Sequence, residues 1–132
     1  MRSALLLVAL LVANAAFAEP RVEVFTDRGH PVAQTEAFAD VTVYRLDGLA
    51  LAQDQLSEGL PSDPTEAATV AAQRLDAQPM LSKQMMQAGQ GLTLAHLQYR
   101  LDRYPAIVFD GATVIYGVTD LAIAYRLYEA HE

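Results

Sequence analysis

The residues best suited to chemistry in this chain lie in one short segment, Asp27-Arg28-Gly29-His30-Pro31. An imidazole at position 30 could bind a partner, contact a metal or act as a base. His30 acting together with Asp27 would suit a hydrolase. A hydrolase also needs a nucleophile, and the sequence places no serine within residues 27–32 or 102–109. The alternative is an ordinary solvated loop in which His30 has no function.

A second polar segment, Asp102-Arg103-Tyr104-Pro105, precedes an apolar run near the C-terminus. Arginine and tyrosine are residue types that are enriched at binding hot spots. Charged neighbours could pair within Asp27-Arg28, or across to Asp102 and Arg103. Exposed pairs of this kind contribute only about 0–1 kcal/mol, so recognition is a stronger reason for them than stability. Solvated charges without a binding role are the alternative for Asp27 and Asp102.

Composition argues against several classes of function. The 132 residues include 16 acidic and 9 basic side chains, and the formal net charge of −7 disfavours direct binding of nucleic acid or anionic lipid. Cysteine is absent, so thiol chemistry and disulfides are excluded. The three histidines, His30, His96 and His131, show no metal-ligand spacing. We therefore expect neither a metal nor a cofactor.

The N-terminal segment 1–18 has the pattern of a cleavable secretory signal peptide. Arg2 precedes an apolar run over Ala4–Ala13, and the small-residue site Ala16-Phe17-Ala18 follows. That run is roughly half of the 20 apolar residues that a membrane-spanning helix needs. We predict cleavage after Ala18 and export, with an uncleaved signal anchor as the alternative. Residues 19–132 then form a single domain, because this length suits one hydrophobic core and is too short for two.

The apolar pattern predicts the elements of this domain. Residues 22–26 and 41–46 are rich in β-branched and aromatic residues and predict two strands, while residues 32–39 between them permit two helical turns. A short helix is expected over residues 49–60. Asp63 and Pro64 mark the start of a longer helix, which Pro79 interrupts. The helical pattern resumes over residues 80–90, and a further amphipathic stretch runs from Leu92 to Arg103.

The C-terminal part predicts a β-hairpin followed by a helix. Strands over residues 105–109 and 113–116 flank the turn Asp110-Gly111, and Thr119 or Asp120 caps a last helix. Helices between the first strands suggest parallel crossovers. The full order predicts an α/β, thioredoxin-like fold: a mixed four-stranded sheet with flanking helices and a C-terminal β-hairpin plus helix.

In thioredoxin-like folds, the loop after the first strand lies beside a cis-proline that opens the third strand. The predicted partner-binding cleft therefore comprises Asp27, Arg28, His30, Pro31, Arg103, Tyr104 and Pro105. The run Val22–Thr26 with the following His30-Pro31 also resembles a glutaredoxin strand and loop. In this resemblance His30 replaces the first cysteine and the second cysteine position is near Ala33. The resemblance implies a domain that cannot exchange disulfides.

A closer resemblance rests on four parts of the chain: Val24–Asp27 with His30–Val32, Tyr44–Gly48, Asp102–Gly111 and Tyr116–Leu121. Together they resemble a family of small exported proteins of unassigned molecular role, encoded in integrating conjugative elements of Gram-negative bacteria. That family is distantly similar to pilus-assembly proteins of F-type conjugation. The resemblance implies a periplasmic location, a protein partner in the transfer apparatus, and a part in mating-pair formation or type IV secretion.

Three functions follow from these observations. The first is a non-catalytic interaction module that binds a partner protein through the predicted cleft. The second is an enzyme, as a redox-inactive relative of thiol oxidoreductases with a residual activity at His30. The third is a holder of extended pilin-like chains, which differs from the first in what occupies the cleft.

Overall fold

A computed structural model describes residues 19–131 of the chain. The predicted signal peptide, residues 1–18, lies outside the described residues. Two strands come first, separated by a short helical turn. A group of helices follows, and the chain ends in a β-hairpin and a last helix. None of the helices within residues 19–131 combines the length and the apolar character needed to cross a bilayer.

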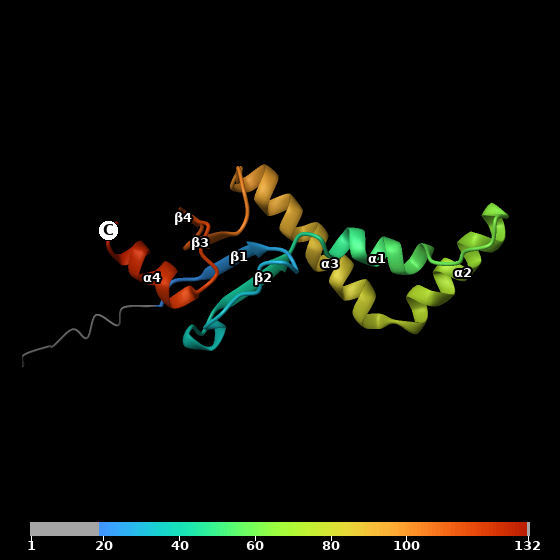
Figure 1. Cartoon of the computed structure of the whole chain (residues 1–132), viewed down its shortest axis with the longest axis horizontal. Coiled ribbons are helices and arrows are strands. Elements are labelled where there is room, and N and C mark those ends of the chain that lie inside the picture. The colour runs from blue at the N-terminus through green and yellow to red at the C-terminus, as the bar shows by residue number, and fades with distance from the viewer. Residues whose placement is uncertain (1–18, 132) are drawn as a thin grey trace, which may run out of the picture.

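Four strands form one mixed sheet in the order β2-β1-β3-β4 (Figure 1). Strand β1 (Val22–Thr26) pairs in parallel with β2 (Val41–Arg45) and antiparallel with β3 (Ala106–Phe109). Strand β3 pairs antiparallel with β4 (Thr113–Tyr116), and helix α4 (Leu121–Glu129) follows. This topology confirms the predicted fold class, an α/β thioredoxin-like domain with a mixed four-stranded sheet.

The turns at the C-terminal end form as the sequence predicts. Asp110 and Gly111 both adopt positive φ, 51° and 68°, between the two hairpin strands. Glycine and aspartate tolerate this left-handed region better than most residues. The cap of α4 is Asp120, whose Oδ1 accepts hydrogen bonds from the N–H groups of Ala122 at 2.9 Å and Ile123 at 3.2 Å.

The segment between β1 and β2 corrects one prediction. Only Thr35–Ala37 is helical there, as a single 3-10 turn labelled η1, instead of two helical turns over residues 32–39. Ala33 forms a bridge with Asp120: its N–H donates to the Thr119 carbonyl at 2.9 Å, and its carbonyl accepts from the Leu121 N–H at 3.1 Å. Backbone groups that pair with a distant segment are not available for the i to i+4 bonds of a helix.

Three helices and a short π-helical segment connect β2 to β3. They are α1 (Gly48–Ser57), α2 (Pro64–Ala77), α3 (Pro79–Thr93) and the π segment η2 (Leu94–Gln98). Asp63 caps α2, and Pro79 opens α3 after the break, as predicted. The last helical stretch ends at Gln98 rather than Arg103, because Arg100 adopts a positive φ of 50° and the Leu101 N–H folds back to the Ala95 carbonyl.

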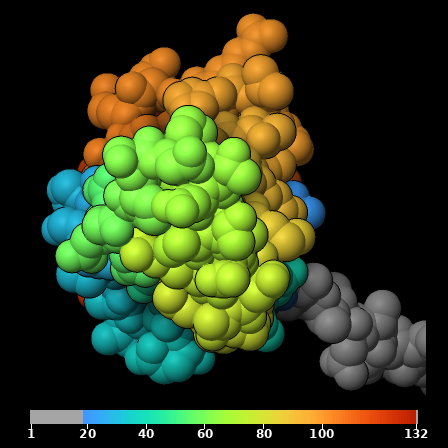
Figure 2. Space-filling model, turned by 90° about the vertical axis from the view of Figure 1, so that its right-hand side faces the viewer, coloured from blue at the N-terminus to red at the C-terminus, as the bar shows by residue number. Residues whose placement is uncertain are grey.

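These helices project from one end of the sheet. Figure 1 shows α1, α2 and α3 extending away from the strands, and in Figure 2 α2 and the beginning of α3 cover the end that faces the viewer. Helix α2 buries none of its residues fully. By contrast, α3 packs against the sheet at its C-terminal end, where Gly91 lies over Tyr44 of β2. Helices α1 and α2 are therefore connected to the sheet mainly through α3.

The core covers both faces of the sheet, and β1 is buried throughout. One face packs Val22, Val24, Ile107 and Phe109 against Leu121 and Ala124 of α4. The other packs Phe25, Tyr44, Ala106 and Val108 against Ala95 and Leu101. Glu23 is also buried, at 7% exposure, and its carboxylate accepts a hydrogen bond from the Tyr99 hydroxyl at 2.5 Å and pairs with Arg21 at 3.4 Å. These partners offset the cost of burying the charge.

Candidate functional site

The predicted site residues lie at one edge of the sheet, where β1 and β2 end and β3 begins. The register pairs Thr26 with Arg45 and Phe25 with Ala106. The loop after β1 and the residues before β3 therefore reach the same edge, and the Tyr104–Pro105 peptide bond is cis. We call the seven predicted site residues at this edge the rim: Asp27, Arg28, His30, Pro31, Arg103, Tyr104 and Pro105.

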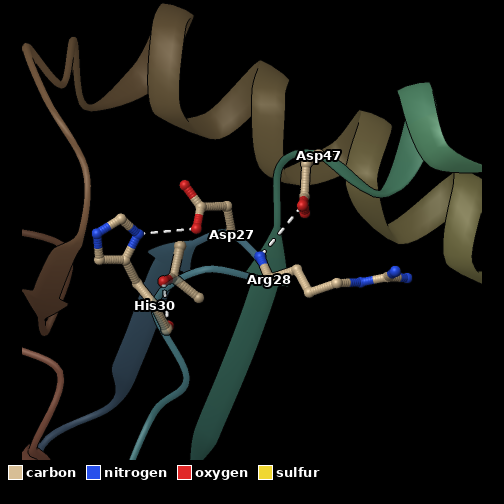
Figure 3. Close-up of polar contacts among 5 residues, drawn as sticks. Asp27, Arg28, His30 and Asp47 are labelled. Carbon is tan, nitrogen blue, oxygen red and sulfur yellow. Dashed lines mark hydrogen bonds and ion pairs between the residues drawn. The ribbon is translucent and has the colours of Figure 1, made fainter.

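Hydrogen bonds within the chain fix the loop after β1 (Figure 3). His30 Nδ1 lies 2.8 Å from Asp27 Oδ1, and the His30 N–H donates to the Asp27 carbonyl at 3.2 Å. The Thr26 hydroxyl donates to the His30 carbonyl at 2.7 Å. The hydrogen bond with His30 is the main cause that lowers the pKa of the Asp27 carboxyl below its ordinary value. The loop thus presents His30, half-exposed, in a defined orientation.

Arg28 turns away from this pair. Its backbone N–H donates to Asp47 Oδ2 at 3.1 Å, which ties the loop to the residue that precedes α1. Figure 3 shows that its side chain extends away from His30. The fold therefore divides the loop between two surfaces, with His30 on one side and the Arg28 guanidinium on the other.

The residues before β3 form the second half of the rim. The Arg103 guanidinium carbon lies 4.6 Å from the centre of the Tyr116 ring, which is a cation–π distance. Tyr104 is 36% exposed, and partial burial, with a smaller effect of Tyr116, raises the pKa of its hydroxyl. Within residues 19–131, no hydrogen bond uses the backbone N–H or carbonyl of Tyr104. Both groups are therefore without a hydrogen-bond partner in the described part of the chain.

The ion pairs expected among the rim charges were assigned to the wrong partners. Asp27 pairs with His30 rather than with Arg28 or Arg103, because the tight turn after β1 brings the imidazole onto its carboxylate. Arg103 lies over Tyr116 instead of reaching across to Asp27. The two halves of the rim are thus neighbours through the strand register and not through charge pairing.

A cavity of about 120 Å³ adjoins the rim on the side of β2. The apolar residues that line it are buried or half-buried: Val43, Leu51, Ala52, Leu81 and Ala88. Its polar lining residues are Arg28, Arg45, Asp47, Gln55, Gln84 and Gln87, and all of these but Asp47 are exposed. The cavity therefore has an apolar floor and a polar mouth.

Of the predicted site residues, Arg28 lines this cavity, and the sequence reasoning missed the others. The strand predicted over residues 41–46 ends just before Asp47, and no role in the site is predicted for Asp47 from the sequence. Asp47 instead caps nothing with its side chain, accepts the bond from Arg28, and leaves its Oδ1 buried without a hydrogen-bond partner. Such an atom calls for an explanation in a native structure. A signal for this site was present in the sequence, because Arg45 and Asp47 place two charged residues where the predicted strand over residues 41–46 ends.

The groups at this edge offer hydrogen bonding, charge and an oriented imidazole. The Asp27–His30 pair has the geometry of a carboxylate that orients an imidazole, with Nε2 left for another contact. Both side chains are exposed to solvent, at 40% and 52%. Among residues 19–131, no three His, Asp or Glu side chains cluster in a way that could hold a metal ion. The rim offers an exposed pattern of an acid, an imidazole, a guanidinium and a phenol.

Comparison with known proteins adds a family to this description. A family model described as "Protein of unknown function (DUF1525)" matches residues 19–132. No curated protein and no solved structure matches the sequence. The matched region contains both halves of the rim and all the residues of the cavity.

Proposed function

The chain belongs to the DUF1525 family, and for it we propose the function of a non-catalytic, periplasmic interaction module of an integrating conjugative element. It binds a protein of the transfer apparatus, in mating-pair formation or type IV secretion. Export relies on the signal peptide predicted for residues 1–18, and cleavage leaves Glu19 as the first residue. The surface that contacts the partner consists of the rim residues other than Pro105, which is buried.

One observation carries the binding role: the register of the sheet gathers exposed recognition residues from two distant segments. His30 is oriented by Asp27 at 2.8 Å, and Arg103 is held over Tyr116. Next to them, Tyr104 presents an exposed ring and unpaired backbone groups. Side chains that are already ordered lose less conformational entropy on binding, which favours a specific contact.

Two features support recognition over chemistry. The 132 residues include no cysteine, so the reaction of thiol oxidoreductases has no nucleophile here. The Asp27–His30 pair lies in solvent rather than in an enclosed pocket, where electrostatic effects on a reaction are strongest. An exposed, oriented imidazole is well suited to donate or accept a hydrogen bond at an interface.

The link to conjugation comes from the sequence resemblance, and every rim residue except Arg28 lies in the resembling segments. Val24–Asp27 and His30–Val32 supply its first half, and Asp102–Gly111 supplies its second. The segment Tyr44–Gly48 supplies Arg45 and Asp47 of the adjacent cavity. Parts of three of the four resembling segments therefore meet at one edge of the sheet.

The test replaces His30, Arg103 and Tyr104 by alanine, singly and together, in the native host. Transfer of the element to recipients is measured together with the amount of the protein in the periplasmic fraction. Arg126→Ala and His131→Ala are matched controls: both residues are exposed, and Arg126 lies near Pro20, at the opposite end of β1. Analysis of the exported protein by mass spectrometry checks that it begins at Glu19.

We expect the triple variant to lose transfer while its periplasmic level stays normal, and the two controls to behave like the wild type. Cross-linking from position 104 should then capture one defined protein. Capture of many unfolded chains would instead favour the function of a holder of extended chains. Normal transfer by the triple variant would refute the rim as the functional surface, and a protein found in the cytoplasm would refute the periplasmic role.

A further inference from the structure

The cavity beside β2 has the size of a subsite for one side chain. Its volume of about 120 Å³ is well below the roughly 300–1,000 Å³ of sites that hold drug-sized molecules or cofactors. Its floor of Val43, Leu51 and Leu81 suits an apolar group. The natural occupant is therefore a single apolar side chain rather than a whole organic molecule.

The mouth of the cavity carries two exposed guanidinium groups. Neither the Arg28 guanidinium nor the Arg45 guanidinium makes an ion pair or a hydrogen bond within the described part of the chain. With the carboxylate of Asp47, the lining has a formal charge of +1, in a chain whose net charge is −7. A ligand with one negative charge would complement this lining, and arginine recognises carboxylates particularly well.

Helix α1 begins on the wall of the same cavity. Gly48, its first residue, lines the cavity, and the N-cap residue Asp47 makes no side-chain capping bond. The first N–H groups of a helix have no partner within the helix, and they favour anionic groups. Asp47 already places a carboxylate at this helix start, with its Oδ1 buried and without a hydrogen-bond partner, so Arg28 and Arg45 supply the positive charge that a ligand carboxylate would meet.

From these features we propose that the cavity binds the C-terminal residue of a partner protein, with an apolar side chain on the floor and the free carboxylate at the two arginines. A chain terminus is the part of a protein that presents an apolar side chain and a carboxylate on the same residue. Capture of a C-terminal carboxylate is a known mode of peptide recognition. This inference rests on the proposed interaction function and states the chemistry of the partner. Because Arg28 belongs to both the rim and the cavity, the two surfaces are continuous.

The experiment is an NMR titration of the ¹⁵N-labelled exported protein with three hexapeptides. One ends in leucine as the free acid, the second has the same sequence with a C-terminal amide, and the third ends in glycine as the free acid. Arg45→Gln removes one guanidinium from the mouth. Arg126→Gln is the matched control, since Arg126 is exposed on α4 and does not line the cavity. The spectrum of each variant also reports whether it is folded.

The leucine acid should shift the amide signals of Val43, Leu51 and Leu81. The amide and the glycine peptide should bind at least tenfold more weakly, as should the leucine acid to Arg45→Gln, while Arg126→Gln should bind normally. Equal binding of the acid and the amide, or no shift of the cavity signals at millimolar peptide, would overturn the inference. The proposed function would survive that result if the rim variants still lose transfer. Normal transfer by the rim variants would instead refute the function itself.

Discussion

Gly91→Ala tests how closely α3 must approach the sheet. A Cβ atom at position 91 would lie 2.6 Å from Tyr44 Cβ and 2.9 Å from Tyr44 Cγ. Tyr44 cannot rotate its own Cβ away, so either α3 or β2 has to shift. Tyr44 is 6% exposed, and its ring stacks on Phe25 with centroids 5.2 Å apart. The added methyl group therefore disturbs one face of the core.

Two opposing effects determine how far Gly91→Ala changes the free energy of unfolding. Alanine is favoured over glycine within a helix by about 1 kcal/mol. Overpacking a well-packed core costs about 1–3 kcal/mol, and the rigid contact with Tyr44 places this site toward the upper part of that range. We expect Gly91→Ala to lower the free energy of unfolding by about 1–2 kcal/mol.

Gly89→Ala is the matched control on the same helix. A Cβ atom at position 89 meets no heavy atom within 4 Å, so this variant should gain up to about 1 kcal/mol from helix propensity alone. Urea unfolding followed by far-UV circular dichroism measures both variants against the wild type. A Gly91→Ala protein as stable as the wild type or the Gly89→Ala protein would refute the argument that Gly91 is required by close packing.

Three further predictions concern single polar contacts. Asp63→Ala removes the cap of α2 and should cost about 0.5–2 kcal/mol, measured by urea unfolding; unchanged stability would contradict this assignment. Tyr99→Phe removes the hydrogen bond to buried Glu23, at a cost of about 1.5–3 kcal/mol. Burial, and after it the hydrogen bond to Glu23, raises the pKa of the Tyr99 hydroxyl. The neutral hydroxyl therefore stabilises the fold at lower pH, and this stabilisation is lost as pH rises through and above the ordinary tyrosine pKa. Stability should consequently fall less steeply at alkaline pH in Tyr99→Phe than in the wild type. His30→Ala should return the lowered pKa of Asp27 toward its ordinary value in an NMR titration, whereas in the wild type this pair stops stabilising the fold as pH falls through the lowered pKa.

Local signals along the chain determined much of the architecture. The Asp110-Gly111 turn, the Asp63 cap, the break at Pro79 and the Asp120 cap each depend on residues within four positions of one another. Such preferences act before any tertiary contact forms, so the sequence alone indicates them. The order of the elements then limits the topology, and the predicted thioredoxin-like sheet is the one that forms.

Contacts between distant residues decided the rest. The bridge of Ala33 with Asp120 takes the place of the two helical turns that residues 32–39 permit, and the bond of Tyr99 to Glu23 permits a charged residue inside the sheet. Neither partner can be identified from its sequence neighbours. The outcome depends on which backbone and side-chain groups the packed sheet leaves without another partner.

For the candidate site too, some features follow from the sequence and others from the tertiary structure. The sequence by itself determined which residue types stand at the ends of β1 and β3, and the order of elements brought them to one edge. Only the tertiary structure decided that Arg103 lies over Tyr116 and that Arg28 turns to the cavity with Arg45. The physical reason is that side-chain partners depend on distances across strands and helices, which hydrophobic periodicity does not specify.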